Sequence, residues 1–113
     1  MRENILLIRY TTGKPDQAIV LTGEFRQEGK RWLAECVETG TATYAATMAQ
    51  ARAELSDAIT LQFDEIEKLG FVEQYLQDHR IRPQNIAPTS QRKSGRRPTW
   101  AIPQEASKTL TPA

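Results

Sequence analysis

The chain has 113 residues, a formal net charge of +1 and a single cysteine. This length fits one domain, and no apolar run approaches the roughly 18 residues that cross a membrane. The apolar stretch from Ile5 to Ile8 is too short for a signal peptide, and the lone Cys36 permits no internal disulfide. We therefore expect a single-domain cytoplasmic protein that has no membrane segment.

The near-zero net charge conceals an acidic body and a basic end. Residues 1–79 hold 8 Lys and Arg against 13 Asp and Glu, a balance of −5. Residues 80–113 hold 7 Lys and Arg against Glu105 alone, a balance of +6. Opposite charges on two proteins accelerate their encounter. The division indicates that the body suits a basic partner.

Residues 1–17 give an ambiguous pattern. The segment from Ile5 to Tyr10 is apolar enough for a strand but does not alternate cleanly, and turn-forming residues follow from Thr11 to Asp16. The pattern is compatible with an extra strand and also with an unattached N-terminal segment.

Three strands are expected next, near residues 18–27, 31–38 and 41–45. Apolar residues alternate with polar ones in the first two strands, and Gly29 and Gly40 supply the connections. The side chains expected on one face are Ile19, Leu21, Gly23, Phe25, Trp32, Ala34 and Cys36.

A long helix is expected over residues 47–69. Thr47 is suited to cap its first turn together with Gln50, and Gly70 is suited to end it. A short second helix follows, from Phe71 to about His79. Apolar residues recur at steps of three or four and form a stripe that faces the sheet: Ala51, Leu55, Ala58, Ile59, Phe63, Ile66 and Leu69. The predicted fold is α+β, a three-stranded antiparallel sheet covered by one long helix.

The residues from 82 to 113 are predicted to form a disordered basic tail. Five of the six prolines lie there among Ser, Thr, Gln and Arg, a composition that buries too little apolar surface to fold. One alternative function is nucleic-acid binding through this tail by charge and stacking. The candidate residues are Arg92, Lys93, Arg96, Arg97 and Trp100.

Groups that commonly carry catalysis are scarce in this sequence. With His79 and Cys36 as the sole histidine and cysteine, neither a zinc-ligand set nor a usual Ser/His or Cys/His pair is expected. A phosphate-binding glycine loop is also missing. We therefore predict a binding protein without catalytic residues, metal or cofactor, rather than an enzyme.

The central part of the chain resembles the HicB antitoxin family. The matching segments are WLAEC at 32–36, ETGTATY at 38–44, the helix start at Thr47 and EIEKLG at 65–70. The resemblance covers residues 18–81, although Ala45-Ala46 replaces the family's usual Gly-Asp. It implies a half-RNase-H-like fold and the binding of a small basic mRNA-cleaving toxin of the HicA type, with its active site covered.

Exposed acidic residues are the expected toxin contacts: Glu35, Glu38, Asp57, Asp64 and Glu65. Because about 65 ordered residues bury a limited core, we also expect a homodimer, formed through Leu33 and Val37. The segment after Ile81 shows no helix-turn-helix or ribbon-helix-helix pattern, so direct operator-DNA binding is not expected. An orphan HicB-like adaptor is the other alternative, since a fold does not determine a function.

Overall fold

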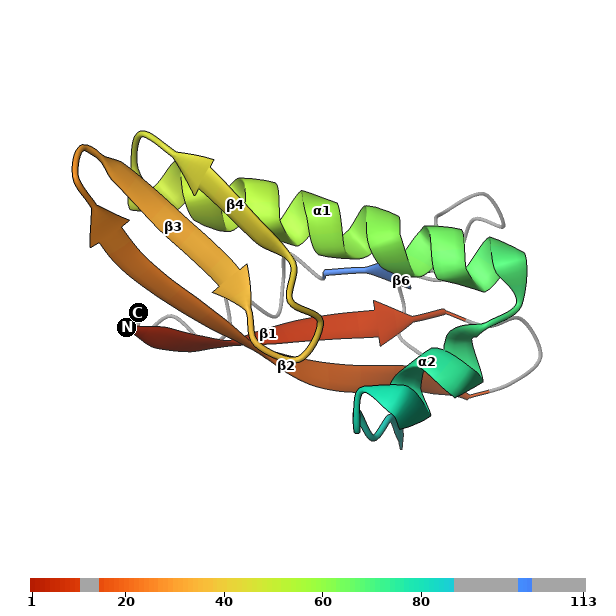
Figure 1. Cartoon of the computed structure of the whole chain (residues 1–113). Coiled ribbons are helices and arrows are strands. Elements are labelled where there is room, and N and C mark those ends of the chain that lie inside the picture. The colour runs from red at the N-terminus through yellow and green to blue at the C-terminus, as the bar shows by residue number, and fades with distance from the viewer. Residues whose placement is uncertain (11–14, 87–99, 103–113) are drawn as a thin grey trace.

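The sheet has more strands than the sequence suggests, and one long helix lies across it (Figure 1). The structure, a computed structural model, describes residues 1–10, 15–86 and 100–102. No helix among these residues is long and apolar enough to cross a membrane. The strands are β1 (Arg2–Arg9), β2 (Asp16–Glu28), β3 (Arg31–Cys36), β4 (Ala42–Ala45), β5 (Gln84–Ile86) and β6 (Trp100–Ala101), and the helices are α1 (Met48–Leu69) and α2 (Val72–Asp78).

The 13-residue strand β2 organises the sheet, whose order is β4-β3-β2-β1-β6. On one edge β2 pairs antiparallel with the whole of β1, from Arg2↔Glu24 to Arg9↔Gln17. Its other edge is shared, because the C-terminal half pairs with β3 and residues 16–18 pair with β5. The sheet is therefore antiparallel throughout, and its two ends have different neighbours.

The core lies between the sheet and α1. The predicted stripe is confirmed at its centre, where Ala51, Leu55, Ile59 and Phe63 are all 0% exposed. Leu69, the last member of the stripe, is 61% exposed because it lies in the final helical turn, beyond the sheet-facing residues. From the sheet, the residues that enter this core are Ile5, Leu7, Ile19, Leu21, Phe25, Ala34 and Cys36.

Both predicted ends of α1 are confirmed. The backbone N–H of Gln50 donates a hydrogen bond of 3.1 Å to Oγ1 of Thr47, which satisfies one of the free amides of the first turn. Gly70 ends the helix in the left-handed region at φ 78°, and its N–H is donated to a carbonyl of the last turn.

The prediction of a three-stranded sheet is wrong, since six strands are present among the described residues. β1 lies in the N-terminal segment, for which the sequence allows either an extra strand or an unattached segment. Its residues Leu7 and Ile8 are 0% and 6% exposed although they point to opposite faces. A strand that is covered on both faces loses the polar–apolar alternation, which explains why its sequence pattern was ambiguous.

The other additional strands lie in the segment from 82 to 113, which was predicted to be disordered. Residues 84–86 pair with the start of β2, and residues 100–101 pair with the end of β1. Trp100 is 0% exposed and joins the core. This corrects the predicted boundary at Ile81. Residues 87–99 and 103–113 lie outside the described residues, and for them the prediction of disorder stays untested.

Candidate functional site

A groove of about 660 Å³ lies between α1 and α2 and is the candidate binding site. Leu61 and Phe71 are 70% and 60% exposed there, unusually high values for two large apolar side chains that line one hollow. Such a surface is typical of a protein that buries it against a partner. The residues that line the groove are Ala58, Leu61, Gln62, Glu65, Ile66, Phe71 and Tyr75.

The turn between the two helices creates the groove. After Gly70, the N–H of Phe71 bonds the carbonyl of Ile66 at 3.1 Å, so the chain turns sharply out of α1. α2 then places Val72 and Leu76 in the core, which leaves Phe71 outside. The sequence places Phe71 in the same short helix as those two residues and gives no sign that its side chain is exposed. Leu61 was also missed, and its signal was an apolar residue on the polar face of the predicted helix.

Polar contacts fix the wall of the groove nearest the sheet. Nε2 of Gln62 donates to the hydroxyl of Tyr75 at 3.1 Å, and Oε1 of Gln62 accepts from Thr41 at 2.7 Å. The ring of Tyr75 also packs edge-on against Phe63, with centroids 5.5 Å apart. Burial raises the pKa of the Tyr75 hydroxyl above its usual range. The groove is therefore largely preformed.

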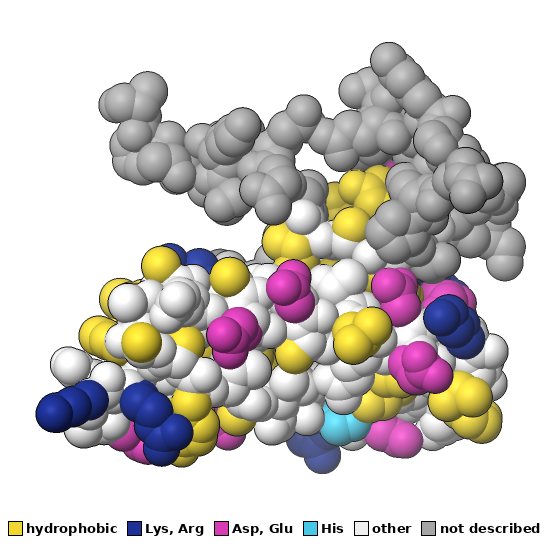
Figure 2. Space-filling model, turned by 90° about the horizontal axis from the view of Figure 1, so that it is seen from above, with side chains coloured by type: hydrophobic (Ala, Val, Ile, Leu, Met, Phe, Trp, Pro, Cys, Tyr) yellow, Lys and Arg dark blue, Asp and Glu magenta, His cyan; other side chains and the backbone are white. Residues whose placement is uncertain are grey.

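Acidic side chains border this groove on the outer side of α1. Glu54, Asp57 and Glu65 are exposed, and within the described part of the chain none of the three makes an ion pair. Figure 2 views the molecule from the side on which α1 lies, and acidic and apolar side chains appear next to one another there. The candidate surface thus combines exposed apolar groups with uncompensated negative charge.

The structure does not bring the five predicted toxin contacts together. Asp57 and Glu65 share the outer face of α1, and Glu65 lines the groove. Glu35 lies on the opposite face of the sheet, directly across from Glu24 of β2. The remaining two, Glu38 and Asp64, are partly buried and are bonded to other segments of the chain.

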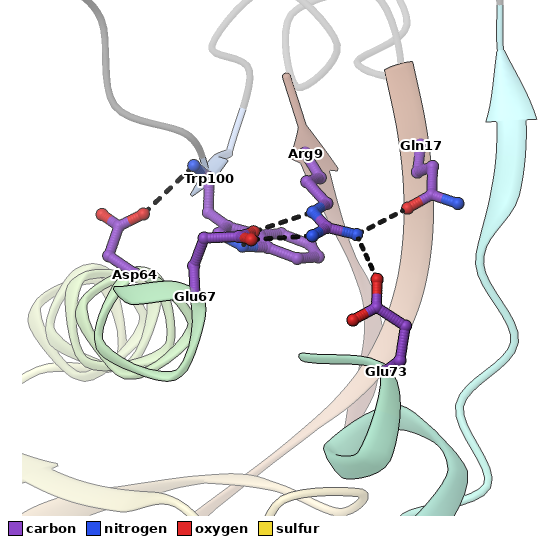
Figure 3. A network of polar contacts seen from close by, with 6 residues as sticks. All are labelled: Arg9, Gln17, Asp64, Glu67, Glu73 and Trp100. Atoms are coloured by element: carbon purple, nitrogen blue, oxygen red, sulfur yellow. Dashed lines mark hydrogen bonds and ion pairs between the residues drawn. The ribbon is translucent and has the colours of Figure 1, made fainter. Parts of the chain in front are cut away.

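Glu38 and Asp64 each accept hydrogen bonds that hold the fold. The two carboxylate oxygens of Glu38 accept from the N–H and hydroxyl of Thr22 at 2.7 and 2.9 Å. Asp64 accepts from the N–H of Trp100 at 3.1 Å (Figure 3). Burial raises the pKa of Asp64 above its usual range, and the bond from Trp100 opposes that shift. Neither carboxylate is a free surface charge.

One of the five nucleic-acid candidates lies among the described residues. Arg92, Lys93, Arg96 and Arg97 lie outside the described residues. Trp100 is 0% exposed and packs on Phe63, so its ring is not accessible for stacking on a base in this structure.

The two residues proposed for a homodimer differ in exposure. Leu33 is 7% exposed and is therefore buried, contrary to the expectation of a free apolar side chain. Val37 is 48% exposed, in the turn that follows β3. The homodimer itself stays a prediction.

Cys36 and His79 both lie near Glu38. Cys36 is 0% exposed, and its Sγ is 3.8 Å from Oε1 of Glu38. Burial raises the pKa of the Cys36 thiol, which keeps it protonated at neutral pH. Nδ1 of His79 is 2.9 Å from the carbonyl oxygen of Glu38, and its ring stacks on Tyr75. The described residues contain no group of three or more His, Cys, Asp or Glu able to hold a metal ion.

The buried thiol predicts a measurable pH dependence. The folded state retains the Cys36 proton above about pH 8.5, where the unfolded chain releases it. The unfolded state then binds fewer protons, so the free energy of unfolding should fall as pH rises, by up to about 1.4 kcal/mol per pH unit. Urea titrations at several alkaline pH values should show this fall relative to Cys36→Ala, which lacks the thiol. A constant difference between the two proteins would contradict the prediction.

Comparisons with models of protein families, with curated proteins and with solved structures each found no match.

Proposed function

We propose that this protein is an antitoxin-like binding protein, which neutralises a small basic mRNA-cleaving toxin of the HicA type by covering its active site. The HicB-like segments of the sequence suggest this partner. The proposal includes the half-RNase-H-like fold that the same resemblance implies. The observation that carries it is the exposed apolar groove with acidic residues at its border.

The groove has the composition of a protein-binding site. Interfaces commonly place a few apolar anchors at the centre and polar groups around them, and a few central residues provide most of the binding energy. Leu61 and Phe71 would be such anchors, since both are more than half exposed in the free protein. Burying them against a partner removes apolar surface from water, which favours association.

The charge of the border favours a basic partner. Asp57 and Glu65 are exposed on the same side of α1 as the groove. A ribonuclease needs positive charge where it holds the RNA backbone, and an acidic surface attracts that region. Binding there places the antitoxin over the site that the RNA would occupy, which is the neutralisation that we propose.

The test compares two identical substitutions on one helix. Leu61→Arg introduces a charge into the groove, whereas Leu69→Arg places it at a site of similar exposure outside the groove lining. The partner to test is any small basic protein that is encoded beside this gene. Leu61→Arg should weaken binding by about 30-fold or more and abolish rescue of growth on co-expression. Leu69→Arg should behave as the parent.

The acidic border is tested separately. The double variant Asp57→Lys and Glu65→Lys should slow association severalfold at low salt, and the difference should shrink at high salt. If Leu61→Arg binds as tightly as Leu69→Arg, the groove is not the interface. If the neighbouring protein binds the groove without being toxic, the adaptor function replaces the antitoxin function.

A further inference from the structure

Trp100 occupies a slot that two core elements form together (Figure 3). The backbone of β6 pairs with the edge of β1 at Ile8↔Ala101 and Arg9↔Trp100. The indole ring is 0% exposed and contacts Phe63 of α1, with centroids 4.9 Å apart. We call this site the tryptophan slot; it consists of the β1 edge at Ile8 and Arg9 and the side chains of Arg9, Phe63, Asp64 and Glu67.

The slot recognises both polar hydrogens of a tryptophan residue. The backbone N–H of Trp100 donates to Oδ1 of Asp64 at 3.1 Å, and its indole Nε1–H donates to Oε1 of Glu67 at 2.9 Å. No other largely apolar ring carries an N–H donor of this kind, because phenylalanine has none and tyrosine carries its hydroxyl at a different place. The acceptors of the slot therefore match tryptophan better than other large apolar side chains.

The receptor side of the slot has its own supports. Nε and a terminal nitrogen of Arg9 each donate to a different oxygen of Glu67 at 2.7 Å. Arg9 is held in turn by Gln17 at 3.1 Å and by Glu73 of α2 at 3.2 Å. These bonds do not involve Trp100. Glu67 is thus oriented in part by bonds that do not depend on the tryptophan, as expected of a preorganised binding site.

The occupant, in contrast, is very short. β6 has two residues, and the nearest described residue before it in the chain is Ile86, 14 positions before Trp100. Its described hydrogen bonds all go to the slot. We propose that the tryptophan slot is a binding site for an extended, tryptophan-bearing segment, and that residues 100–101 of this chain fill it as an intramolecular ligand.

Two contacts connect the tryptophan slot to the groove. Phe63 touches Trp100 on one side and Tyr75, which lines the groove, on the other. Arg9 joins Glu67 in the slot to Glu73 at the start of α2. Filling the slot therefore steadies the α2 wall of the groove, an effect on partner binding that rests on the proposed function above.

The test removes the tryptophan side chain from the slot and supplies a tryptophan on a separate peptide. Full-length Trp100→Ala is mixed with a synthetic peptide of residues 97–104, and binding is followed by calorimetry and by the melting temperature. The peptide should bind this variant and raise its melting temperature with increasing concentration. It should bind the parent at least about 10-fold more weakly, because the parent's own tryptophan competes at high effective concentration.

Two control peptides test the chemistry. A peptide with 1-methyltryptophan keeps the ring but lacks the Nε1–H, and it should bind about 10-fold more weakly or worse, because the charged Glu67 loses its donor. A peptide with alanine at this position should not bind. The proposal would be overturned if the 1-methyltryptophan peptide bound Trp100→Ala as tightly as the unmodified peptide does. Equal binding of the unmodified peptide to the parent and to Trp100→Ala would also overturn it.

A second variant covers the case in which Trp100→Ala does not fold. Trp100→Phe keeps an aromatic ring in the slot without the indole donor, so the peptide should bind it more tightly than the parent. If neither variant binds the peptide, Trp100 is an ordinary core residue and the slot does not accept a separate segment. None of these measurements uses the toxin partner, so they stand apart from the proposed function.

Discussion

Replacing Trp100 with alanine should lower the free energy of unfolding by about 3–5 kcal/mol, although this residue lies in a segment whose composition suggests disorder. The indole is 0% exposed and is the largest fully buried side chain of the described residues. The substitution removes the ring contact with Phe63 and leaves a cavity beside it. It also removes the indole donor to Glu67. Urea denaturation of the purified full-length proteins measures the loss.

Trp100→Phe is the matched control, since it retains most of the ring and should lose clearly less stability than Trp100→Ala. A chain that ends at residue 82 should lose at least as much as Trp100→Ala, because it lacks β5 and β6 together. Stability of Trp100→Ala within a few tenths of a kcal/mol of the parent would mean that β6 does not seal the core in solution.

Leu55→Ala should lower the free energy of unfolding by about 2–5 kcal/mol. Leu55 is 0% exposed at the centre of the α1 face that covers the sheet. Shortening it removes apolar contacts and opens a cavity that close-packed neighbours fill only in part. The expected result is a lower denaturation midpoint with an unchanged slope, measured by circular dichroism in urea.

The same helix offers the control for this substitution. Leu61→Ala removes the same atoms from a side chain that is 70% exposed, so its effect should stay within about 0.5 kcal/mol. The two variants share the change in helix propensity, and their difference isolates burial. Similar effects of both substitutions would show that α1 does not place Leu55 against the sheet.

The sequence by itself determined the elements whose signals are local. α1 was predictable because its apolar residues recur with the helical period and because Thr47 and Gly70 mark its ends. The hairpin of β2 and β3 was predictable for a similar reason, since residues that alternate along each strand decide which side chains face the core. These signals need only neighbours in the chain.

The acidic residues show where such reasoning ends. Their number and their place in the body were evident from the sequence, but their partners were not. Glu38 bonds Thr22, 16 positions away, and Asp64 bonds Trp100, 36 positions away. An acidic side chain is a free charge or a structural acceptor depending on which segment folds against it. Of the five predicted toxin contacts, only Asp57 and Glu65 lie with the groove.

The tertiary structure alone decided the extent of the sheet and the presence of the groove. β1 and β6 were indistinct in the sequence because a strand's partner supplies half of its hydrogen bonds and lies far away in the chain. The groove depends on the angle at which α2 leaves Gly70, which in turn depends on Val72 and Leu76 reaching the core. In the sequence, Trp100 stands among prolines and basic residues, a composition typical of a tail. Only the folded structure brings it against the edge of β1, Phe63 and the carboxylates of α1.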